Sequence, residues 1–234
     1  MGAILKREFK SYFQTPVGYI VLAAYFFFLS MFFGYYYGYG SPDIQNILIG
    51  AMSIVIVFTV PILTMRLMSE DRRQKTDQAL LTAPVKLTSI VFGKFLAAFF
   101  LYMLCFSPTV IFEIIIKSNV DVSLFKYLYA LLGVFLLGAA LIAIGQFISS
   151  LTESPVISAI LTLVINIVVL YMSSFASLIN ISWLSKAAEK MAFITASESF
   201  ANETLSIPDI VYFLSITAVF LFLSVRSLEK RRWA

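Results

Sequence analysis

Charged side chains that could do chemistry are concentrated in one short stretch, Ser69-Glu70-Asp71-Arg72-Arg73-Gln74-Lys75-Thr76-Asp77. Acids and bases are mixed there without a histidine that could serve as a base, a pattern that suits charge pairing with another protein better than proton transfer. The whole chain has no His and one Cys, Cys105, inside an apolar run. Triads that need His, His/Cys metal clusters and internal disulfides are therefore excluded.

A P-loop, Gly-x-x-x-x-Gly-Lys-Ser/Thr, is also missing from the sequence, so the chain cannot hold ATP in that manner. We interpret Cys105 as a small buried apolar residue. We expect no catalytic residue, no metal ligand and no cofactor on this chain.

The charged stretch predicts a short helix that docks on a soluble partner. Ser69 can cap such a helix, Glu70 and Asp71 suit its first turn, and Pro84 would end it. The leucines after the charges suit anchors in a groove. The candidate docking residues are Glu70, Asp71, Arg72, Arg73, Thr76, Leu80, Leu81 and Pro84.

Two polar side chains stand inside apolar runs, where such residues often mark a transport path. Glu113 could be a transport-site carboxylate, or it could form a local helix pair with Lys117, four residues later. Asn166 could be a candidate polar site, or it could join helices by hydrogen bonding, within the subunit or across a dimer interface. Pro108 follows Ser107 in the same run as Glu113, and it should kink that helix.

Composition indicates that these residues sit on membrane-spanning helices. Hydrophobic residues make up 60% of the 234 residues and charged residues only 13%, against roughly a quarter charged in soluble domains. A lone segment in lipid must satisfy its own backbone, so each long apolar run should be a helix. We therefore predict an all-α integral membrane protein with six transmembrane helices, at about Val17–Tyr39, Ile44–Met65, Ile90–Ile116, Tyr127–Ser149, Val156–Ile179 and Asp209–Val225.

The basic residues fix the expected orientation. With the N-terminus in the cytoplasm, 13 of the 17 Lys and Arg residues fall on the inner side. The positive-inside rule therefore predicts that both termini are cytoplasmic, N-in and C-in. Lys94 would lie near the inner end of the third span, where a lysine can extend its ammonium group to water.

Residues 1–16 are expected to form a separate amphipathic helix. Leu5, Phe9, Tyr12 and Phe13 share one face, while Lys6, Arg7 and Lys10 lie on another. Such a helix lies in the membrane interface, and Pro16 would separate it from the first span. It is either a basic anchor that sets topology or an "elbow" helix that meets a cytoplasmic partner, through Leu5, Arg7, Phe9 and Phe13.

Three motifs, in order, resemble the membrane subunits of the second class of ABC exporters. The first is the charged loop, where Glu70, Arg72, Arg73, Thr76, Leu80, Leu81, Thr82, Pro84 and Val85 match; Lys75 stands where Gly is usual and Gln78 where an acid is usual. The second, Ile144 to Glu153, is similar to the Ser-Ser-Leu-Thr-Glu turn of the branch with the gliding-motility and nitrous-oxide-reductase maturation permeases. The third is the tail, Leu228-Glu229-Lys230-Arg231-Arg232-Trp233; before it, Phe200-Ala201-Asn202-Glu203 replaces the usual Phe-x-Arg-Gly.

The resemblance implies a domain plan for the chain. Residues 1–16 would be the elbow helix, 17–226 the six-span domain, and 66–89 the cytoplasmic coupling loop with its coupling helix. Residues 180–208 would form an extracytoplasmic loop with short helices, and 227–234 a basic cytoplasmic tail.

The resemblance also implies the partners and the mode of action. The chain would sit in a bacterial cytoplasmic membrane and pair with a second copy or a sibling permease. Two ABC ATP-binding subunits would bind ATP and Mg²⁺, with room for an extracytoplasmic accessory subunit, and no nucleic acid is involved. ATP hydrolysis on the partner would drive export or extraction of a substrate.

Two other functions remain open from the sequence. A secondary transporter or channel would need intramembrane charges or repeats, which are nearly absent, and would not need a docking helix. A membrane anchor for an ATPase, without cargo transport, would share the docking helix.

Overall fold

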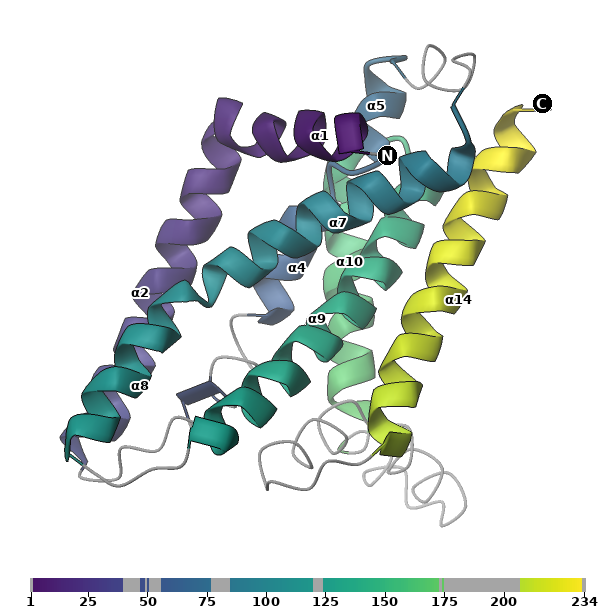
Figure 1. The fold of residues 1–234 in the computed structure, drawn as a ribbon. Coiled ribbons are helices and arrows are strands. Elements are labelled where there is room, and N and C mark those ends of the chain that lie inside the picture. The colour runs from purple at the N-terminus through teal and green to yellow at the C-terminus, as the bar shows by residue number, and fades with distance from the viewer. Residues whose placement is uncertain are drawn as a thin grey trace.

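Every described element is an α-helix, and no strand occurs among the described residues. The computed structural model describes residues 2–39, 47, 48, 50, 56–76, 85–119, 124–172, 174 and 207–232. The helices are α1 (Gly2–Gln14), α2 (Pro16–Gly38), α4 (Val57–Thr64), α5 (Ser69–Arg73), α7 (Leu87–Cys105), α8 (Ser107–Asn119), α9 (Leu124–Leu151), α10 (Pro155–Leu170) and α14 (Ile207–Arg232). Figure 1 shows them as a bundle of long helices with α1 lying across one end.

Four described stretches are long and apolar enough to cross a membrane: α2, α7 with α8, α9, and α14. Helix α10 is apolar but shorter, and α4 covers only part of the predicted second span. The prediction of an all-helical membrane protein is confirmed for the described part of the chain. The count of six spans stays a prediction, because much of 44–65 and 156–179 beyond α4 and α10 lies outside that part.

Helix α9 forms the core of the bundle. In its most apolar window 67% of the residues are buried, against 22% for α2 and for α14. Its sequence is apolar on all sides, as expected for a helix surrounded by others. Helices α14, α10, α4 and α7 all pack on it. At the crossing with α7, Gly138 lies directly against the ring of Tyr102, so the two backbones approach closely.

Proline sets two of the helix boundaries. Thr15 has extended φ and ψ angles, the conformation favoured before a proline, and Pro16 then opens α2 at its first turn. At the second boundary, α7 ends at Cys105 and α8 begins at Ser107. Pro108 has no backbone N–H to continue the ladder there, and Thr109 donates its hydroxyl to the carbonyl of Phe106 at 2.6 Å. The kink expected at Pro108 is therefore present.

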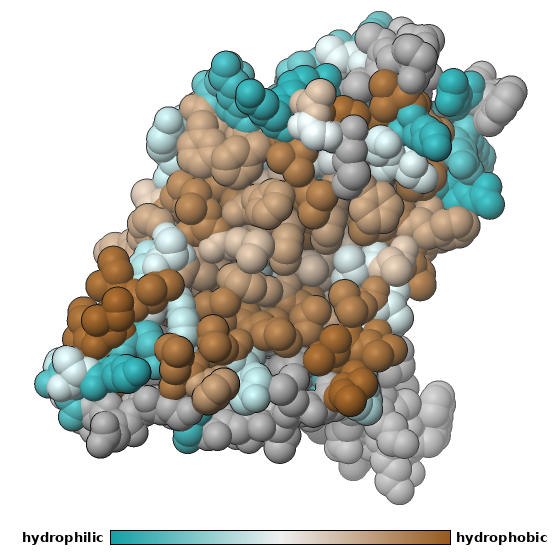
Figure 2. Space-filling model, in the orientation of Figure 1, coloured by the Kyte–Doolittle hydropathy of each residue, from teal (hydrophilic) through white to brown (hydrophobic). Residues whose placement is uncertain are grey.

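One end of the bundle is basic and carries both described ends of the chain. Helix α1, helix α5 and the C-terminal turns of α14 lie together there (Figure 1). Figure 2 shows hydrophilic residues at this end and a broad hydrophobic band along the middle of the bundle. We call this region the basic end; its cations are Lys6, Arg7, Lys10, Arg66, Arg72, Arg73, Lys75, Lys86, Lys94, Arg226, Lys230, Arg231 and Arg232.

Candidate functional site at the basic end

Lys94 is the centre of an ionic junction between α1, α5 and α7. Its ammonium nitrogen lies 2.6 Å from Oδ2 of Asp71 on α5 and 3.2 Å from Oε1 of Glu8 on α1. The Lys94 side chain is only 1% exposed. The expectation that Lys94 would reach out to water is therefore wrong. Two carboxylates from other elements meet the ammonium group inside the protein and replace its hydration.

The junction is balanced in charge. Glu8 also pairs with Arg7 at 2.5 Å, so two cations and two anions form a continuous chain, Arg7–Glu8–Lys94–Asp71. Thr76 donates its hydroxyl to Oδ1 of Asp71 at 3.1 Å. Buried charges persist in proteins when they are paired and hydrogen-bonded. Because its members come from three helices, the junction ties α1 to α5 through α7.

A second pair ties the start of the charged loop to α1. Arg66 donates to Glu70 in a fork, with Nη2 at 2.6 Å from Oε1, and it donates to the hydroxyl of Thr15 at 3.0 Å. Tyr12 of α1 donates a hydrogen bond from its hydroxyl to the carbonyl of Leu63, at 2.8 Å. Burial raises the pKa of Tyr12, so the hydroxyl stays protonated and keeps this donor role.

A polar cleft of about 420 Å³ lies between α1 and the charged loop. Arg7, Glu8, Ser11, Tyr12, Gln14, Thr15, Arg66, Leu67, Glu70, Asp71 and Gln74 line it. Arg66 bonds Thr15 directly across the cleft, and Lys94 of α7 joins Glu8 of α1 to Asp71 of α5, so movement of α5 would pull on α1.

Ser149 of α9 holds the first residues of α5. Its hydroxyl oxygen accepts from the backbone N–H groups of Met68 and Ser69, both at 3.1 Å. We expected Ser69 to cap this helix, but Ser69 lies inside α5 and donates its own hydroxyl back to the carbonyl of Met65. The capping group comes from another helix, so the sequence near Ser69 could not reveal it.

Arg72 points away from α1, toward the turn between α9 and α10. Its guanidinium donates to the carbonyl of Leu151 at 3.2 Å and to the carboxylate of Glu153 at 3.0 Å. The Ser-Ser-Leu-Thr-Glu motif is therefore joined to the charged loop. Lys94, Glu8, Ser149 and Glu153 all take part in these contacts, and none of them was among the predicted site residues.

The helix expected over 69–83 ends much earlier, at Arg73. Gln74 follows it as the C-cap, and Lys75 has a φ of 57°, in the left-handed region. Thr76 then donates its backbone N–H to the carbonyl of Asp71 at 2.9 Å. This is the bend for which glycine is the usual residue. The bend therefore forms although Lys75 occupies the position.

Lys75→Gly should raise the free energy of unfolding by about 1 kcal/mol, because a side chain at positive φ costs roughly that much. Thermal midpoints in detergent, from size-exclusion profiles after heating, would measure the gain. Lys86→Gly is the matched control, since Lys86 is also exposed and outside a helix but has a φ of −67°. If both variants lower the thermal midpoint by the same amount, the bend at Lys75 carries no strain.

The predicted elbow and docking residues divide into inner and outer groups. On α1, Leu5, Phe9 and Phe13 are half-buried while Arg7 is exposed. On the loop, Glu70, Asp71 and Arg72 are half-buried and engaged within the chain, whereas Arg73 and Thr76 are exposed. Leu80, Leu81 and Pro84 lie outside the described residues. Of the predicted docking cations, Arg73 is the one presented outward.

Glu113 and Asn166 are both buried within the bundle, 3% and 0% exposed. Lys117, one turn further along α8, is exposed, and the helix pair between Glu113 and Lys117 stays a prediction. Asn166 shares one face of α10 with Ser158 and Thr162, and the described part of the chain offers its amide no hydrogen-bond partner. Its burial favours hydrogen bonding within the subunit, and a contact across a dimer interface stays a prediction. A role for either residue in transport stays a prediction.

Together, the fold and the basic end define a multi-pass membrane protein with a built contact region at one end of its bundle. A family model described as ABC-2 type transporter matches residues 1–200. The chain therefore belongs to the ABC-2 type transporter family, and it is a permease subunit of an ABC transporter, a family whose members work with an ABC ATP-binding partner. No curated protein was found to match the chain.

Proposed function

We propose that this permease couples ATP hydrolysis on a separate subunit to export or extraction of a substrate across a bacterial cytoplasmic membrane. The observation that carries the proposal is the ionic junction at Lys94, in a chain of the ABC-2 type transporter family. The junction joins the interfacial helix, the charged loop and a membrane-spanning helix. A push on the loop would therefore be transmitted to the membrane domain.

The basic end is proposed to face the cytoplasm. The concentration of Lys and Arg there supports this orientation through the positive-inside rule. Both described ends of the chain lie on the same side of the bundle, which agrees with an even number of spans. In this orientation α1 is the elbow helix and residues 66–89 are the coupling loop.

The complex is proposed to contain two permeases and two ATP-binding subunits. ATP and Mg²⁺ would be held by the ATP-binding subunits, and this chain would contribute no cofactor site. The three ordered motifs support placement in the branch with the gliding-motility and nitrous-oxide-reductase maturation permeases. An extracytoplasmic accessory subunit would meet the opposite end.

Affinity purification of the tagged chain in mild detergent, followed by mass spectrometry, tests the proposal. We expect a soluble P-loop ATPase to co-purify near equal stoichiometry, and the complex to hydrolyse ATP. A homo-oligomer without ATPase, from a host that expresses the neighbouring genes, would overturn it and favour a secondary transporter or channel. An ATPase that binds but drives no transport would favour the anchor function.

Arg73→Glu should reduce the recovered ATPase at least tenfold, because reversing an interfacial charge creates repulsion worth several kcal/mol. The folded permease should keep its thermal midpoint, since Arg73 is exposed. Arg232→Glu, an exposed charge at the same end but on α14, is the matched control and should leave recovery unchanged. Undiminished recovery with Arg73→Glu would remove Arg73 from the docking surface.

A further inference from the structure

Helix α10 carries a polar stripe on the side that packs into the bundle. Its three polar residues are Ser158, Thr162 and Asn166, and all three are 0% exposed. They follow one another at intervals of four residues, so they share one face and cover about 12 Å of helix at 1.5 Å per residue. A span that is otherwise apolar thus turns a continuous polar face toward its neighbours.

The polar face lies at the contact of α10 with α4 and α9, on both of which α10 packs. A Cβ built at Gly145 of α9 would overlap Oγ1 of Thr64 on α4 and would lie 3.0 Å from Cγ2 of Thr162 on α10. The three helices therefore meet closely at this point. Ser158 and Asn166 lie one turn to either side, and we call this contact, from Ser158 to Asn166, the polar seam.

The polar atoms of the seam are unpartnered in this conformation. Oγ of Ser158, Oγ1 of Thr162 and both polar amide atoms of Asn166 form no hydrogen bond with any described residue. By contrast, the buried hydroxyls of Thr64 and Thr217 donate to the carbonyls four residues earlier, at 2.9 and 2.8 Å. A buried hydroxyl or amide without a partner costs free energy. A conformation that brings hydrogen-bonding groups into the seam would recover that cost.

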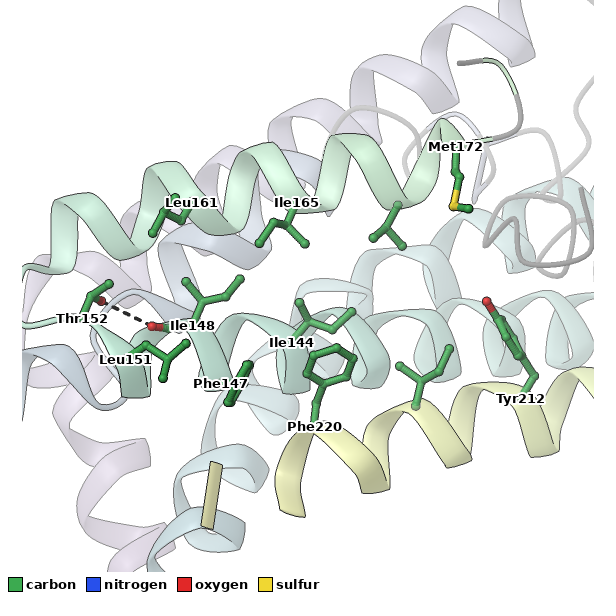
Figure 3. Close-up of a pocket in the computed structure, with 12 residues that line it drawn as sticks. Ile144, Phe147, Ile148, Leu151, Thr152, Leu161, Ile165, Met172, Tyr212 and Phe220 are labelled. Carbon is green, nitrogen blue, oxygen red and sulfur yellow. Dashed lines mark hydrogen bonds between the residues drawn. The ribbon is translucent and has the colours of Figure 1, made fainter. Parts of the chain in front are cut away.

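The opposite side of α10 leaves room for movement. Figure 3 shows Leu161 and Ile165 of α10 at an apolar groove, with α9 and α14 across from them. The groove has a volume of about 480 Å³. Because the polar side chains of α10 are unpartnered and the others are apolar, packing alone holds α10 within the described part of the chain. The helix can shift toward the groove without breaking a side-chain hydrogen bond.

One end of α10 is joined to the charged loop. Arg72 of α5 donates to the carboxylate of Glu153 at 3.0 Å and to the carbonyl of Leu151 at 3.2 Å. Both acceptors lie just before α10, which begins at Pro155. Movement of α5 would therefore reach α10 at its basic end and tilt it.

We propose that α10 tilts away from α4 when α5 moves, and that the opened polar seam is a water-filled entry for uncharged polar groups, leading from the basic end into the bundle. The seam offers hydroxyl and amide donors and acceptors but no charge, so it suits neutral hydrogen-bonding groups and disfavours ions. This inference rests on the proposed function, because the ATP-binding partner supplies the movement of α5.

Cysteine accessibility measures the opening, because a thiol reacts with a charged methanethiosulfonate only where water reaches it. The single native cysteine is removed by Cys105→Ala. Ser158→Cys and Thr162→Cys are made in that background, and the complex with its ATP-binding subunit is placed in nanodiscs. Both thiols should react about tenfold faster during ATP hydrolysis than without nucleotide, as for a minor state whose population rises from about 1% to about 10%.

Ser224→Cys is the matched control. Ser224 of α14 is also 0% exposed, but it lies outside the seam and donates to the carbonyl of Phe220 at 2.8 Å. Its rate should not change with ATP, and equal acceleration at all three positions would overturn the proposal. ATP hydrolysis with unchanged rates at 158 and 162 would overturn this inference alone. A complex without ATP hydrolysis would overturn the proposed function and this inference with it.

Two further variants separate the driving link from the seam. Glu153→Gln should lower the ATP-driven acceleration at 158 and 162 while ATP hydrolysis continues; an unchanged acceleration would overturn the assignment of the link to Glu153. Asn166→Leu should raise the thermal midpoint and lower the acceleration at 162, because leucine leaves no unpartnered amide in the closed seam. A lower thermal midpoint in Asn166→Leu would overturn the unpartnered state of the seam.

Discussion

Lys94→Met should cost roughly 3–5 kcal/mol of the free energy of unfolding, because it removes one partner of a buried ion pair and leaves the others uncompensated. Lys94 is 1% exposed, while Asp71 and Glu8 are 21% and 15% exposed, so all three charges are largely shielded from water. Without the ammonium group, two carboxylates from α1 and α5 face each other. We therefore expect α1 and the charged loop to separate at this end.

Equilibrium unfolding in detergent micelles measures the cost. Lys6→Met and Lys10→Met are the matched controls, since both lysines are exposed on α1, and each should change stability by less than about 0.5 kcal/mol. The triple variant Glu8→Gln, Asp71→Asn and Lys94→Met removes all three charges and should recover most of the loss. If Lys94→Met alone is as stable as the triple variant, the junction contributes little to the free energy of unfolding.

The same variants separate a stabilising role from a coupling role. In the triple variant the fold should be retained, but the charge links between α1, α5 and α7 are gone. If the junction transmits movement, ATP hydrolysis by the partner subunit should continue while transport falls. Transport at the level of the unmodified chain in the triple variant would show that coupling passes elsewhere.

The sequence was sufficient for features governed by local composition. The long apolar helices, the separate helix before Pro16 and the break at Pro108 follow from hydropathy and from the missing N–H of proline. Arg73 could also be placed on an exposed charged segment. Each of these inferences needed only neighbours within a few turns.

The ionic junction could not be predicted in this way, because Glu8, Asp71 and Lys94 are brought together only by the fold. Two signals were available in the sequence. Lys94 lies two turns inside an apolar helix, where its charge needs a carboxylate partner, and Glu8 is an acid in an otherwise basic helix. The helix after Ser69 was predicted too long for a related reason. Lys75 adopts a left-handed conformation that lysine does not usually favour, so the sequence contained no sign of it, and α5 ends before this residue.

Gly138→Ala is expected to destabilise the bundle core by about 3 kcal/mol, at the upper end of the usual cost of overpacking. A Cβ at Gly138 would lie 2.1 Å from Cε1, 2.3 Å from Cζ and 2.7 Å from the hydroxyl oxygen of Tyr102. Tyr102 is fully buried and donates to the carbonyl of Val134 at 3.0 Å. Its ring also packs edge-on against Phe106, with centroids 5.1 Å apart. Because burial, the hydrogen bond and the Phe106 contact hold the ring in place, we expect α7 and α9 to separate.

Gly34→Ala provides the matched control within the same chain. Gly34 also lies inside a spanning helix, α2, but nothing lies within 4 Å of a Cβ built there. Alanine favours the helix over glycine by about 1 kcal/mol, so Gly34→Ala should leave stability unchanged or raise it. If stability falls in Gly138→Ala and does not fall in Gly34→Ala, the loss at 138 comes from the crossing of α7 and α9. Helix propensity would not explain it, because it acts in the same direction at both glycines.

A double-mutant cycle with Tyr102→Leu identifies the contact responsible. Leucine lacks the three ring atoms that the new Cβ would meet, so it relieves the overlap, although it forfeits the hydrogen bond to Val134 and some packing. The loss in the double variant should therefore be smaller than the sum of the two single losses by about 2 kcal/mol. Strictly additive losses would mean that the bundle absorbs the methyl group elsewhere, and that α9 is not held against α7 at this crossing.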